Sequence, residues 1–323
     1  MKDIRVQTTA LRVEDHAVLE TFRFQATENP VYKRYLELLH CNPAGIFETA
    51  LIPFMPIEFF KTHRVVTGPG TETRIFESSG TTGKEPSKHY ILDDGIYIDS
   101  LENGFRHFFG EPSAYCFLAL LPSYLERQNS SLVFMMDHLI RNSRHPLSGF
   151  YLENRNELAQ NLRVLEDSGQ KTMLIGVTFA LLDLAGQFPM PLKNTMIIET
   201  GGMKGQREEL TRHELHSILK AAFSLETVGS EYGMTELLSQ AWSTGNGIYR
   251  TPPWMKILIR DPYDPFRRMP LGKSGGIDII DLANLFSCSF IQTQDLGRLH
   301  PDGSFEVLGR FDNSELRGCN LLV

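Results

Sequence analysis

Hydrophobic and polar positions form two different patterns along the middle of this 323-residue chain. Longer amphipathic stretches carry apolar residues at helical spacing over 156–167 and 206–223, which predicts two helices. Short runs that are mostly apolar are typical of strands buried on both faces. These runs lie at 117–121, 132–136, 172–176 and 195–199. Strands that alternate with helices predict an α/β fold, with a mostly parallel sheet flanked by helices.

The pattern changes on either side of this middle part. Apolar positions at helical spacing around 18–24 and 32–39 predict a mainly helical start. Beyond residue 241, short apolar runs broken by Gly, Pro and Asp predict a β-rich section. Its predicted strands lie at 256–259, 276–280, 297–299 and 304–307. The expected organisation is a core over 1–310, mainly helical over 1–75, α/β over 76–240 and β-rich over 241–310, followed by a tail over 311–323 that carries Cys319.

Composition narrows the class of protein. Apolar residues make up 41% and charged residues 22%, as in soluble globular proteins. The net charge of −7, from 32 basic and 39 acidic side chains, argues against a general nucleic-acid binder. No apolar run is long enough to span a membrane, and the first residues lack the apolar core of a signal peptide. The four cysteines lack the paired spacing of a zinc site or a disulfide framework, so we expect a cytoplasmic protein.

A glycine-rich run follows the apolar pair at 75–76. Glycines let a backbone approach a ligand closely, while hydroxyls and exposed N–H groups form a nest for an anion such as a polyphosphate. A flexible surface loop is the alternative interpretation. The spacing differs from the phosphate loop of nucleotide triphosphatases, because Glu85 stands where Ser or Thr would bind magnesium. The run consists of Ser78, Ser79, Gly80, Thr81, Thr82, Gly83 and Lys84.

A second group of functional side chains lies at 232–236. The ring of Tyr232, which precedes Gly233, can stack on a flat base. Thr235 can bond a phosphate oxygen, and Glu236 can hold a magnesium ion. Alternatively, Thr235 caps a helix that has Glu236 in its first turn.

Two further segments lie near the end of the chain. Asp295 precedes a glycine and a predicted strand, so its carboxylate can chelate the two hydroxyls of a ribose, although a plain Asp-x-Gly turn fits equally well. The charged turn at 309–318, which contains Arg310, can be a solvated hinge.

Taken in order, these four segments resemble the core motifs of adenylate-forming enzymes, the superfamily of acyl-CoA synthetases, peptide-synthetase adenylation domains and luciferases. Residues 271–276 resemble its weaker glycine-rich motif. The resemblance implies a carboxylic acid substrate, with ATP and Mg²⁺ as cofactors. It implies that 78–84 bind the phosphates, that Tyr232 and Gly233 bind the nucleotide, that Thr235 and Glu236 are catalytic with Glu236 on the metal, and that Asp295 and Arg310 bind ribose.

The end of the chain departs from the general pattern. Complete adenylate-forming enzymes continue past the hinge into a small mobile domain with a catalytic lysine. Only 13 residues follow Arg310, so we expect that domain to be absent. From about residue 53 onward, including 124–132, the chain resembles the acyl-protein synthetases of bacterial luminescence (LuxE type, fatty-acid ligases). Among complete enzymes, the chain also resembles phenylacetate-CoA ligases.

That narrower resemblance implies a second step. LuxE-type enzymes carry a cysteine just before the C-terminus that accepts the acyl group, and Cys319 stands there. The implied partner is an acyl-accepting protein, either a reductase-like subunit or an acyl carrier. A nearby Arg317 favours the nucleophilic thiolate, whereas the alternative is an incidental thiol. Two rival functions remain: a non-catalytic nucleotide-binding module, and the large half of a split acyl-CoA ligase.

Overall fold

The computed structural model describes residues 13–79, 85–121, 129–151, 154–201 and 210–311. The chain divides into two compact units. The first unit contains residues up to Ser100, Glu236–Ser239, and the residues from Arg250 onward; the second unit contains Leu101–Thr235 and Gln240–Tyr249. The chain thus leaves the first unit and returns to it twice. No helix among the described residues is long and apolar enough to cross a membrane.

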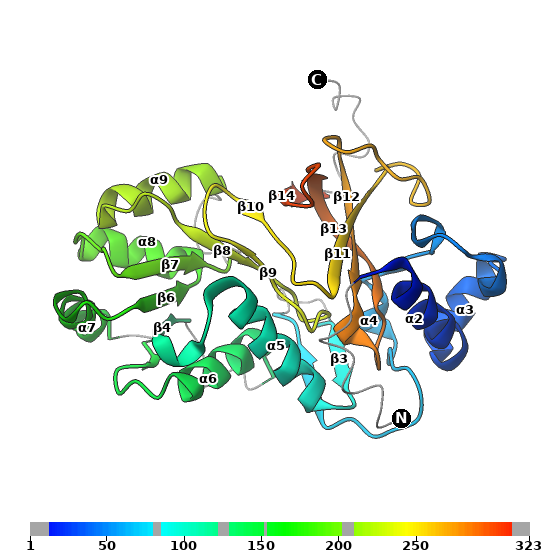
Figure 1. The fold of residues 1–323 in the computed structure, drawn as a ribbon, viewed down its shortest axis with the longest axis horizontal. Coiled ribbons are helices and arrows are strands. Elements are labelled where there is room, and N and C mark those ends of the chain that lie inside the picture. The colour runs from blue at the N-terminus through cyan, green and yellow to red at the C-terminus, as the bar shows by residue number, and fades with distance from the viewer. Residues whose placement is uncertain (1–12, 80–84, 122–128, 152–153, 202–209, 312–323) are drawn as a thin grey trace. The chain divides into compact units, whose positions relative to one another are not determined.

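The second unit is built on a sheet in the strand order β5-β4-β6-β7-β8-β9, with β9 antiparallel and the other strands parallel (Figure 1). The strands are β4 (Cys116–Leu120), β5 (Gly149–Phe150), β6 (Thr172–Gly176), β7 (Thr195–Glu199), β8 (Gly229–Tyr232), β9 (Ala241–Ser243) and β10 (Ile248–Tyr249). The helical elements are η3 (Pro112–Ala114), α6 (Ser131–Ser143), α7 (Arg155–Ser168), α8 (Thr178–Gln187) and α9 (Arg212–Phe223), and α5 (Asp94–Phe109) crosses the boundary between units.

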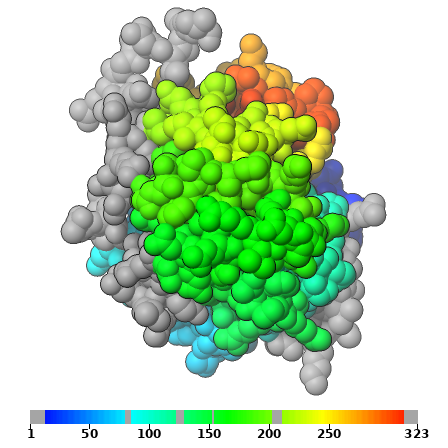
Figure 2. Space-filling view, turned by 90° about the vertical axis from the view of Figure 1, so that its left-hand side faces the viewer, coloured from blue at the N-terminus to red at the C-terminus, as the bar shows by residue number. Residues whose placement is uncertain are grey.

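Helices cover both faces of this sheet. Leu118, Leu174 and Ile197 lie side by side on neighbouring strands and belong to one buried cluster with the apolar residues of α7, α8 and α9. On the other face, Phe117 of β4 contacts Phe105 of α5 edge to face, with ring centroids 5.4 Å apart. In the space-filling view of Figure 2, the green and yellow-green residues that include α7–α9 form a continuous outer layer. The predicted parallel sheet flanked by helices is therefore confirmed.

The first unit contains an antiparallel sheet and several helices. Strands β11, β12, β13 and β14 pair in that order, and β1 pairs with β13 in parallel (Figure 1). The hairpin of β2 and β3 is separate. The strands are β1 (Met55–Pro56), β2 (Arg74–Glu77), β3 (Lys88–Ile91), β11 (Met255–Arg260), β12 (Ser274–Asp281), β13 (Phe290–Leu299) and β14 (Phe305–Arg310). The helical elements are α2 (Asp15–Glu28), α3 (Pro30–Leu38), η1 (Pro43–Gly45), η2 (Thr49–Leu51), α4 (Phe59–Thr62) and η5 (Leu282–Asn284).

Two secondary-structure predictions need correction. The apolar run at 132–136 was expected to be a strand but is the first part of α6, because the Ser130 side chain accepts a hydrogen bond from the Val133 N–H and caps a helix. A short apolar run cannot be assigned by periodicity alone. The helix expected over 206–223 begins at Arg212 in the described part of the chain, where Thr211 and Glu214 form a capping box.

The N-terminal prediction also changes in extent. Helices α2 and α3 account for the expected helical character, and Asn29 caps α3 by accepting from two backbone N–H groups. Beyond Leu38 the chain forms short 3-10 turns, β1 and the four-residue α4. Prolines at 43, 53 and 56 interrupt this stretch, and proline removes a helix donor and disfavours helix in the residue before it. Residues 1–12 lie outside the described part.

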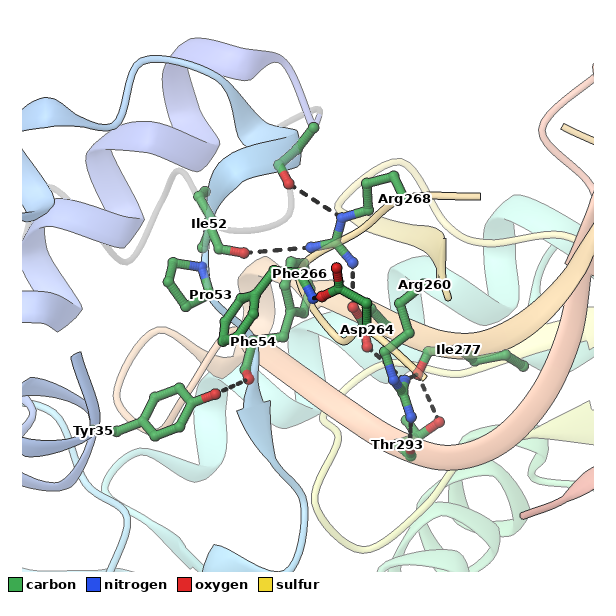
Figure 3. A network of polar contacts seen from close by, with 12 residues as sticks. Tyr35, Ile52, Pro53, Phe54, Arg260, Asp264, Phe266, Arg268, Ile277 and Thr293 are labelled. Atoms are coloured by element: carbon green, nitrogen blue, oxygen red, sulfur yellow. Dashed lines mark hydrogen bonds and ion pairs between the residues drawn. The ribbon is translucent and has the colours of Figure 1, made fainter. Parts of the chain in front are cut away.

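A buried ion network stabilises the antiparallel sheet (Figure 3). Asp278 of β12 is fully buried and accepts hydrogen bonds from Arg260, at 2.7 Å, and from Arg268. Arg260 also donates to the carbonyl oxygens of Ile277 (2.9 Å) and Thr293 (2.6 Å). The guanidinium of Arg260 therefore fastens β11 to both β12 and β13.

Arg268 ties the same network to the N-terminal segment. It donates to the carbonyl oxygens of Ala50 (3.2 Å) and Ile52 (3.4 Å), and it lies over the Phe54 ring, 4.7 Å from the centroid. Figure 3 shows Arg268 pointing toward Ile52, with Phe54 beside it. Two segments more than 200 residues apart in sequence are thus joined by one side chain.

Candidate functional site

Two hydrogen bonds in the first unit join Ser78 and Ser87, the residues at the base of the glycine-rich loop, which we call its neck. The Ser78 N–H donates to the Ser87 carbonyl at 3.0 Å, and the Ser87 N–H donates to Ser78 Oγ at 2.9 Å. These bonds continue the pairing of β2 and β3 beyond their ends. Ser78 thus fixes the neck of the loop, and Ser79 is exposed just beyond it. The predicted phosphate ligands Gly80, Thr81, Thr82, Gly83 and Lys84 lie outside the described residues.

Glu236 lies beside this neck. The Ser87 hydroxyl, whose backbone closes the loop, also donates a hydrogen bond to the Glu236 carboxylate. Only 6% of Glu236 is exposed. Burial raises the pKa of Glu236, and the hydrogen bond from Ser87 and the positive charges of Lys61 and Arg310 oppose that shift. The first unit therefore brings together a carboxylate and the base of the glycine-rich loop, which are 149 positions apart in sequence.

The backbone conformation at 235–236 tests the expectation that Thr235 caps a helix with Glu236 in its first turn. These residues form a turn that follows β8, and the residues up to 240 are neither helix nor strand. The alternative of a helix capped by Thr235 is therefore wrong. The carboxylate of Glu236 is not explained as a helix-capping charge.

Asp295 and Arg310 face each other on β13 and β14. Antiparallel pairing places them in register, and Arg310 Nε lies 3.4 Å from Asp295 Oδ1. The Asp295 side chain is 14% exposed, its backbone N–H donates to Thr293 Oγ1 at 3.1 Å, and the Arg310 side chain is 60% exposed. A solvent-exposed ion pair contributes little to stability. An acceptor and a donor held together at the surface can instead bind the hydroxyl groups of a ligand.

Tyr232, Gly233 and Thr235 belong to the second unit. Tyr232 ends β8, is 8% exposed, and contacts the Tyr249 ring edge to face with centroids 5.9 Å apart. A Cβ atom added at Gly233 would lie 2.2 Å from Glu231 Oε1, so a side chain at Gly233 would displace that carboxyl group. Thr235 is the last residue before the chain passes back into the first unit at Glu236.

The sequence did not lead us to a pair of acidic residues at the carboxyl ends of β7 and β8. Burial and then the charge of Glu199 raise the pKa of Glu231 to about 8, so its carboxyl group is protonated at neutral pH. Glu199 accepts from the Gly201 N–H at 2.8 Å and from Arg212 Nε at 3.3 Å. Ligands of open α/β sheets bind beyond the carboxyl ends of the strands. The acidic residue at the end of the predicted strand 195–199 was the signal for Glu199, whereas Glu231 ends no predicted strand.

The donor set is compatible with one magnesium ion. No group of three or more His, Cys, Asp and Glu side chains that could hold a metal occurs in the described ranges. Mg²⁺ usually keeps several waters and takes one or two carboxylates together with phosphate oxygens of the substrate. Glu236, a single buried carboxylate beside the base of the glycine-rich loop, is compatible with that mode of binding.

Three of the four thiols lie in the described part of the chain. Cys116 and Cys288 are buried, and burial raises the pKa of each, to about 12 for Cys288. Burial also raises the pKa of the half-buried Cys41. These three thiols are therefore protonated and poorly nucleophilic near neutral pH. Cys319 and the rest of the predicted hinge beyond Phe311 lie outside the described residues.

No family model and no curated protein matches the chain, but solved structures share its fold. A 2-hydroxyisobutyryl-CoA ligase in an open conformation with 2-HIB-AMP and CoA is similar to it, with a TM-score of 0.67, 13% identity, and coverage of 93% of this chain and 74% of the ligase. The same ligase in the postadenylation state with 2-HIB-AMP gives a TM-score of 0.65 at 13% identity, over 92% and 67% of the two chains.

A second ligase shares the fold. MatB from Rhodopseudomonas palustris with bound ATP is similar with a TM-score of 0.55 and 16% identity, over 75% of this chain and 49% of MatB. The chain thus spans about half the length of the MatB structures that it matches. At these identities the likeness establishes the fold, an α/β core with an antiparallel β-rich C-terminal section. This confirms the fold expected from the resemblance to adenylate-forming enzymes.

Proposed function

We propose that this protein uses ATP to activate a carboxylic acid as an acyl-adenylate. The observation that carries the proposal lies in the first unit. Ser87, at the neck of the glycine-rich loop, donates to the buried Glu236, and the charge of Arg310 acts on Glu236 while Arg310 also pairs with Asp295. The similar ligase structures contain ATP or an acyl-AMP, which supports a nucleotide as the ligand.

In this proposal the acid carboxylate attacks the α-phosphorus of ATP, the bond to the bridging oxygen breaks, and pyrophosphate leaves. The transition state spreads negative charge over phosphate oxygens, so catalysis requires positioning and neutralisation of charge. Magnesium, when bound, neutralises part of that charge. Glu236 holds the ion, and the loop residues from Ser79 to Lys84 bind the β- and γ-phosphates.

The remaining predicted residues orient the nucleotide. The resemblance to adenylate-forming enzymes assigns Thr235 to a phosphate oxygen and Tyr232 to adenine. Asp295 accepts hydrogen bonds from the ribose hydroxyls while Arg310 donates to the ribose. The register of β13 and β14 supports the ribose assignment, because it places the acceptor Asp295 Oδ1 3.4 Å from the donor Arg310 Nε.

The second step of the proposal is transfer of the acyl group to Cys319. An acyl-adenylate is a mixed anhydride, and thiolate is a strong nucleophile near neutral pH. The Cys319 sulfur attacks the acyl carbonyl, AMP leaves, and a thioester forms, from which an acceptor protein takes the acyl group. This step, and a fatty acid as the substrate, rest on the resemblance to LuxE-type synthetases. The buried and protonated state of Cys116 and Cys288 is consistent with it.

Exchange of labelled pyrophosphate into ATP tests the first step. Folded protein with Mg²⁺ and a panel of short, aromatic and long-chain acids should give exchange that depends on at least one acid. Nucleotide binding by calorimetry with no exchange for any acid would contradict the proposal and identify a non-catalytic module. Thioester formation that requires CoA and a second polypeptide would instead identify a split ligase.

The Cys319→Ser variant tests the second step. It should retain acid-dependent pyrophosphate exchange and lose the hydroxylamine-sensitive acyl-enzyme that intact-mass analysis detects in the wild type. Cys41→Ser is the matched control and should keep both activities. Acylation of Cys41, Cys116 or Cys288 in the wild type would refute transfer through the tail.

A further inference from the structure

Glu236 is carried by a buried segment that is neither helix nor strand. The four residues Glu236–Ser239, which we call the Glu236 strap, have exposed fractions of 6%, 1%, 4% and 1% in chain order. Backbone N–H and C=O groups that are buried outside regular structure need partners from elsewhere. The partners of the strap therefore decide where the Glu236 carboxylate lies.

A single side chain supplies most of these partners. Asp281, the last residue of β12, is fully buried. Its Oδ2 accepts from the N–H groups of Leu238 and Ser239, each at 3.0 Å. Its Oδ1 accepts from the Ser239 hydroxyl at 2.6 Å and from the Ala283 N–H at 3.1 Å. One carboxylate thus joins the end of the strap to the turn that follows β12.

The other contacts of the strap complete a closed network. Asn284 Nδ2 donates to the Glu236 carbonyl oxygen at 2.8 Å, three residues after Asp281. Ser239 Oγ accepts from Trp254 Nε1 at 3.0 Å and lies 3.1 Å from Ser100 Oγ. The first and last residues of the strap are therefore both held by the first unit, and Asp281 is the charged member of this network.

We infer that Asp281 is a positioning residue for Glu236, holding the strap so that the Glu236 carboxylate faces Ser87 and the metal of the proposed adenylation site. The inference rests on the proposed function. Asp281 donates nothing to the substrate and does not touch Glu236; it acts through the backbone of Leu238 and Ser239. Groups that orient a metal ligand in this way typically change metal affinity by about 10- to 100-fold when they are replaced.

The Asp281→Asn variant tests this inference, because an amide keeps the shape of the carboxylate but has one acceptor oxygen for four donors. We expect the Mg²⁺ concentration for half-maximal pyrophosphate exchange to rise by about tenfold or more, with much of the activity restored at saturating Mg²⁺. Calorimetry should show ATP binding without Mg²⁺ to change less than about twofold. Hydrogen exchange at the amides of Leu238 and Ser239 should become faster.

Two further variants separate positioning from general loss of stability. Tyr32→Phe removes a fully buried hydroxyl that donates to the Pro53 carbonyl at 2.6 Å in the same unit and makes no hydrogen bond to the strap or to Asp281 in the described contacts. It should lower the melting temperature without changing the Mg²⁺ requirement. Ser239→Ala removes one donor to Asp281 and is the milder test if Asp281→Asn does not fold; it should shift the Mg²⁺ requirement in the same direction.

Unchanged Mg²⁺ dependence in folded Asp281→Asn, or in Ser239→Ala if the former does not fold, would overturn the inference. An equal shift in Tyr32→Phe would also overturn it. If the wild type shows no acid-dependent exchange, the proposed function fails separately. ATP binding measured by calorimetry with and without Mg²⁺ then tests the positioning role. Weaker Mg²⁺-dependent binding in Asp281→Asn than in the wild type supports this role. Equal binding in the two proteins, or ATP binding by the wild type that does not depend on Mg²⁺, refutes it.

Discussion

Replacing Glu236 with glutamine separates the catalytic role proposed for this carboxylate from a role in stability. Glu236 is 6% exposed and accepts a hydrogen bond from the Ser87 hydroxyl. Glutamine has nearly the same volume and retains an oxygen that can accept from Ser87. It carries no charge, however, and is a poorer magnesium ligand than a carboxylate. The two roles therefore predict different results for the same substitution.

We expect the free energy of unfolding to change by less than about 1 kcal/mol. Burial raises the pKa of Glu236, so the folded protein disfavours the ionised form relative to the unfolded chain. Glutamine removes that penalty and loses the extra strength of a hydrogen bond to a charged acceptor, a difference of about 1 kcal/mol. Because these effects have opposite signs, they largely cancel.

Activity should respond much more strongly. Loss of the proposed metal ligand should lower the rate of pyrophosphate exchange by about 100-fold or more. This corresponds to about 2.8 kcal/mol, because each tenfold change in rate is about 1.4 kcal/mol. The assays are urea denaturation and acid-dependent exchange on the same preparation. Full exchange activity in the variant, or a loss of stability as large as the loss of activity, would refute the reasoning.

Glu166→Gln is the matched control for this experiment. Glu166 lies in α7 and accepts from the N–H groups of Lys193 (2.7 Å) and Asn194 (3.1 Å) and from the Thr195 hydroxyl (2.6 Å). Its role in the structure is therefore to join α7 to the segment before β7 by accepting from one exposed and two part-buried donors. The same substitution here should lower stability by about 1 to 3 kcal/mol and leave the exchange rate of the folded protein unchanged.

Three other predictions follow from the described contacts. Asp278→Ala leaves two buried or half-buried arginines without their carboxylate and should lower the free energy of unfolding by about 3 to 5 kcal/mol in urea titrations; a cost below about 1 kcal/mol would contradict this. Because the pKa of Glu231 is raised from 4.5 to about 8, the folded state binds more protons than the unfolded chain, so this group makes stability fall as pH rises from about 4.5 to 8. Denaturation at pH 5 and pH 8 should show that fall in the wild type and a smaller one in Glu231→Gln. Gly297→Ala places a Cβ 2.6 Å from the Glu306 carbonyl oxygen and should destabilise the protein by about 1 to 3 kcal/mol; an unchanged melting temperature would show that the strands separate freely there.

Local patterns predicted the regular elements of this fold well where burial is continuous. Strands β6 and β7 have the predicted bounds, and α7 exceeds its predicted range by one residue at each end. The strand predicted at 132–136 was wrong, because these apolar residues are also compatible with a helix whose buried positions include Met135, Met136 and Leu139. Only the capping bond from Val133 to Ser130 distinguishes the two, and it requires the folded backbone.

The sequence proposes candidate-site residues only where they lie within a short motif. Glu236 and Asp295 were proposed because their motifs resemble those of adenylate-forming enzymes, and their roles stay predictions. Ser87 and Asp281 were not identified, since each acts on a segment more than 40 residues away in sequence. No local rule predicts such tertiary hydrogen bonds. The exposed and paired state of Arg310 likewise depends on the register of β13 and β14.

The discontinuous path of the first unit has a consequence for the order of folding during synthesis. The ring of Phe22 in α2 contacts that of Phe290 in β13, and Gln25 donates to Ser289 and to the carbonyl oxygens of Asn284 and Leu285. Phe290 is made 268 residues after Phe22, so the apolar face of α2 waits about 15 to 50 s for its partner at about 5 to 20 residues per second. During that interval nearly all of the second unit has already left the ribosome and can fold on the nascent chain. Slowing translation between residues 100 and 250 lengthens that interval and should therefore increase aggregation more than slowing it after residue 311.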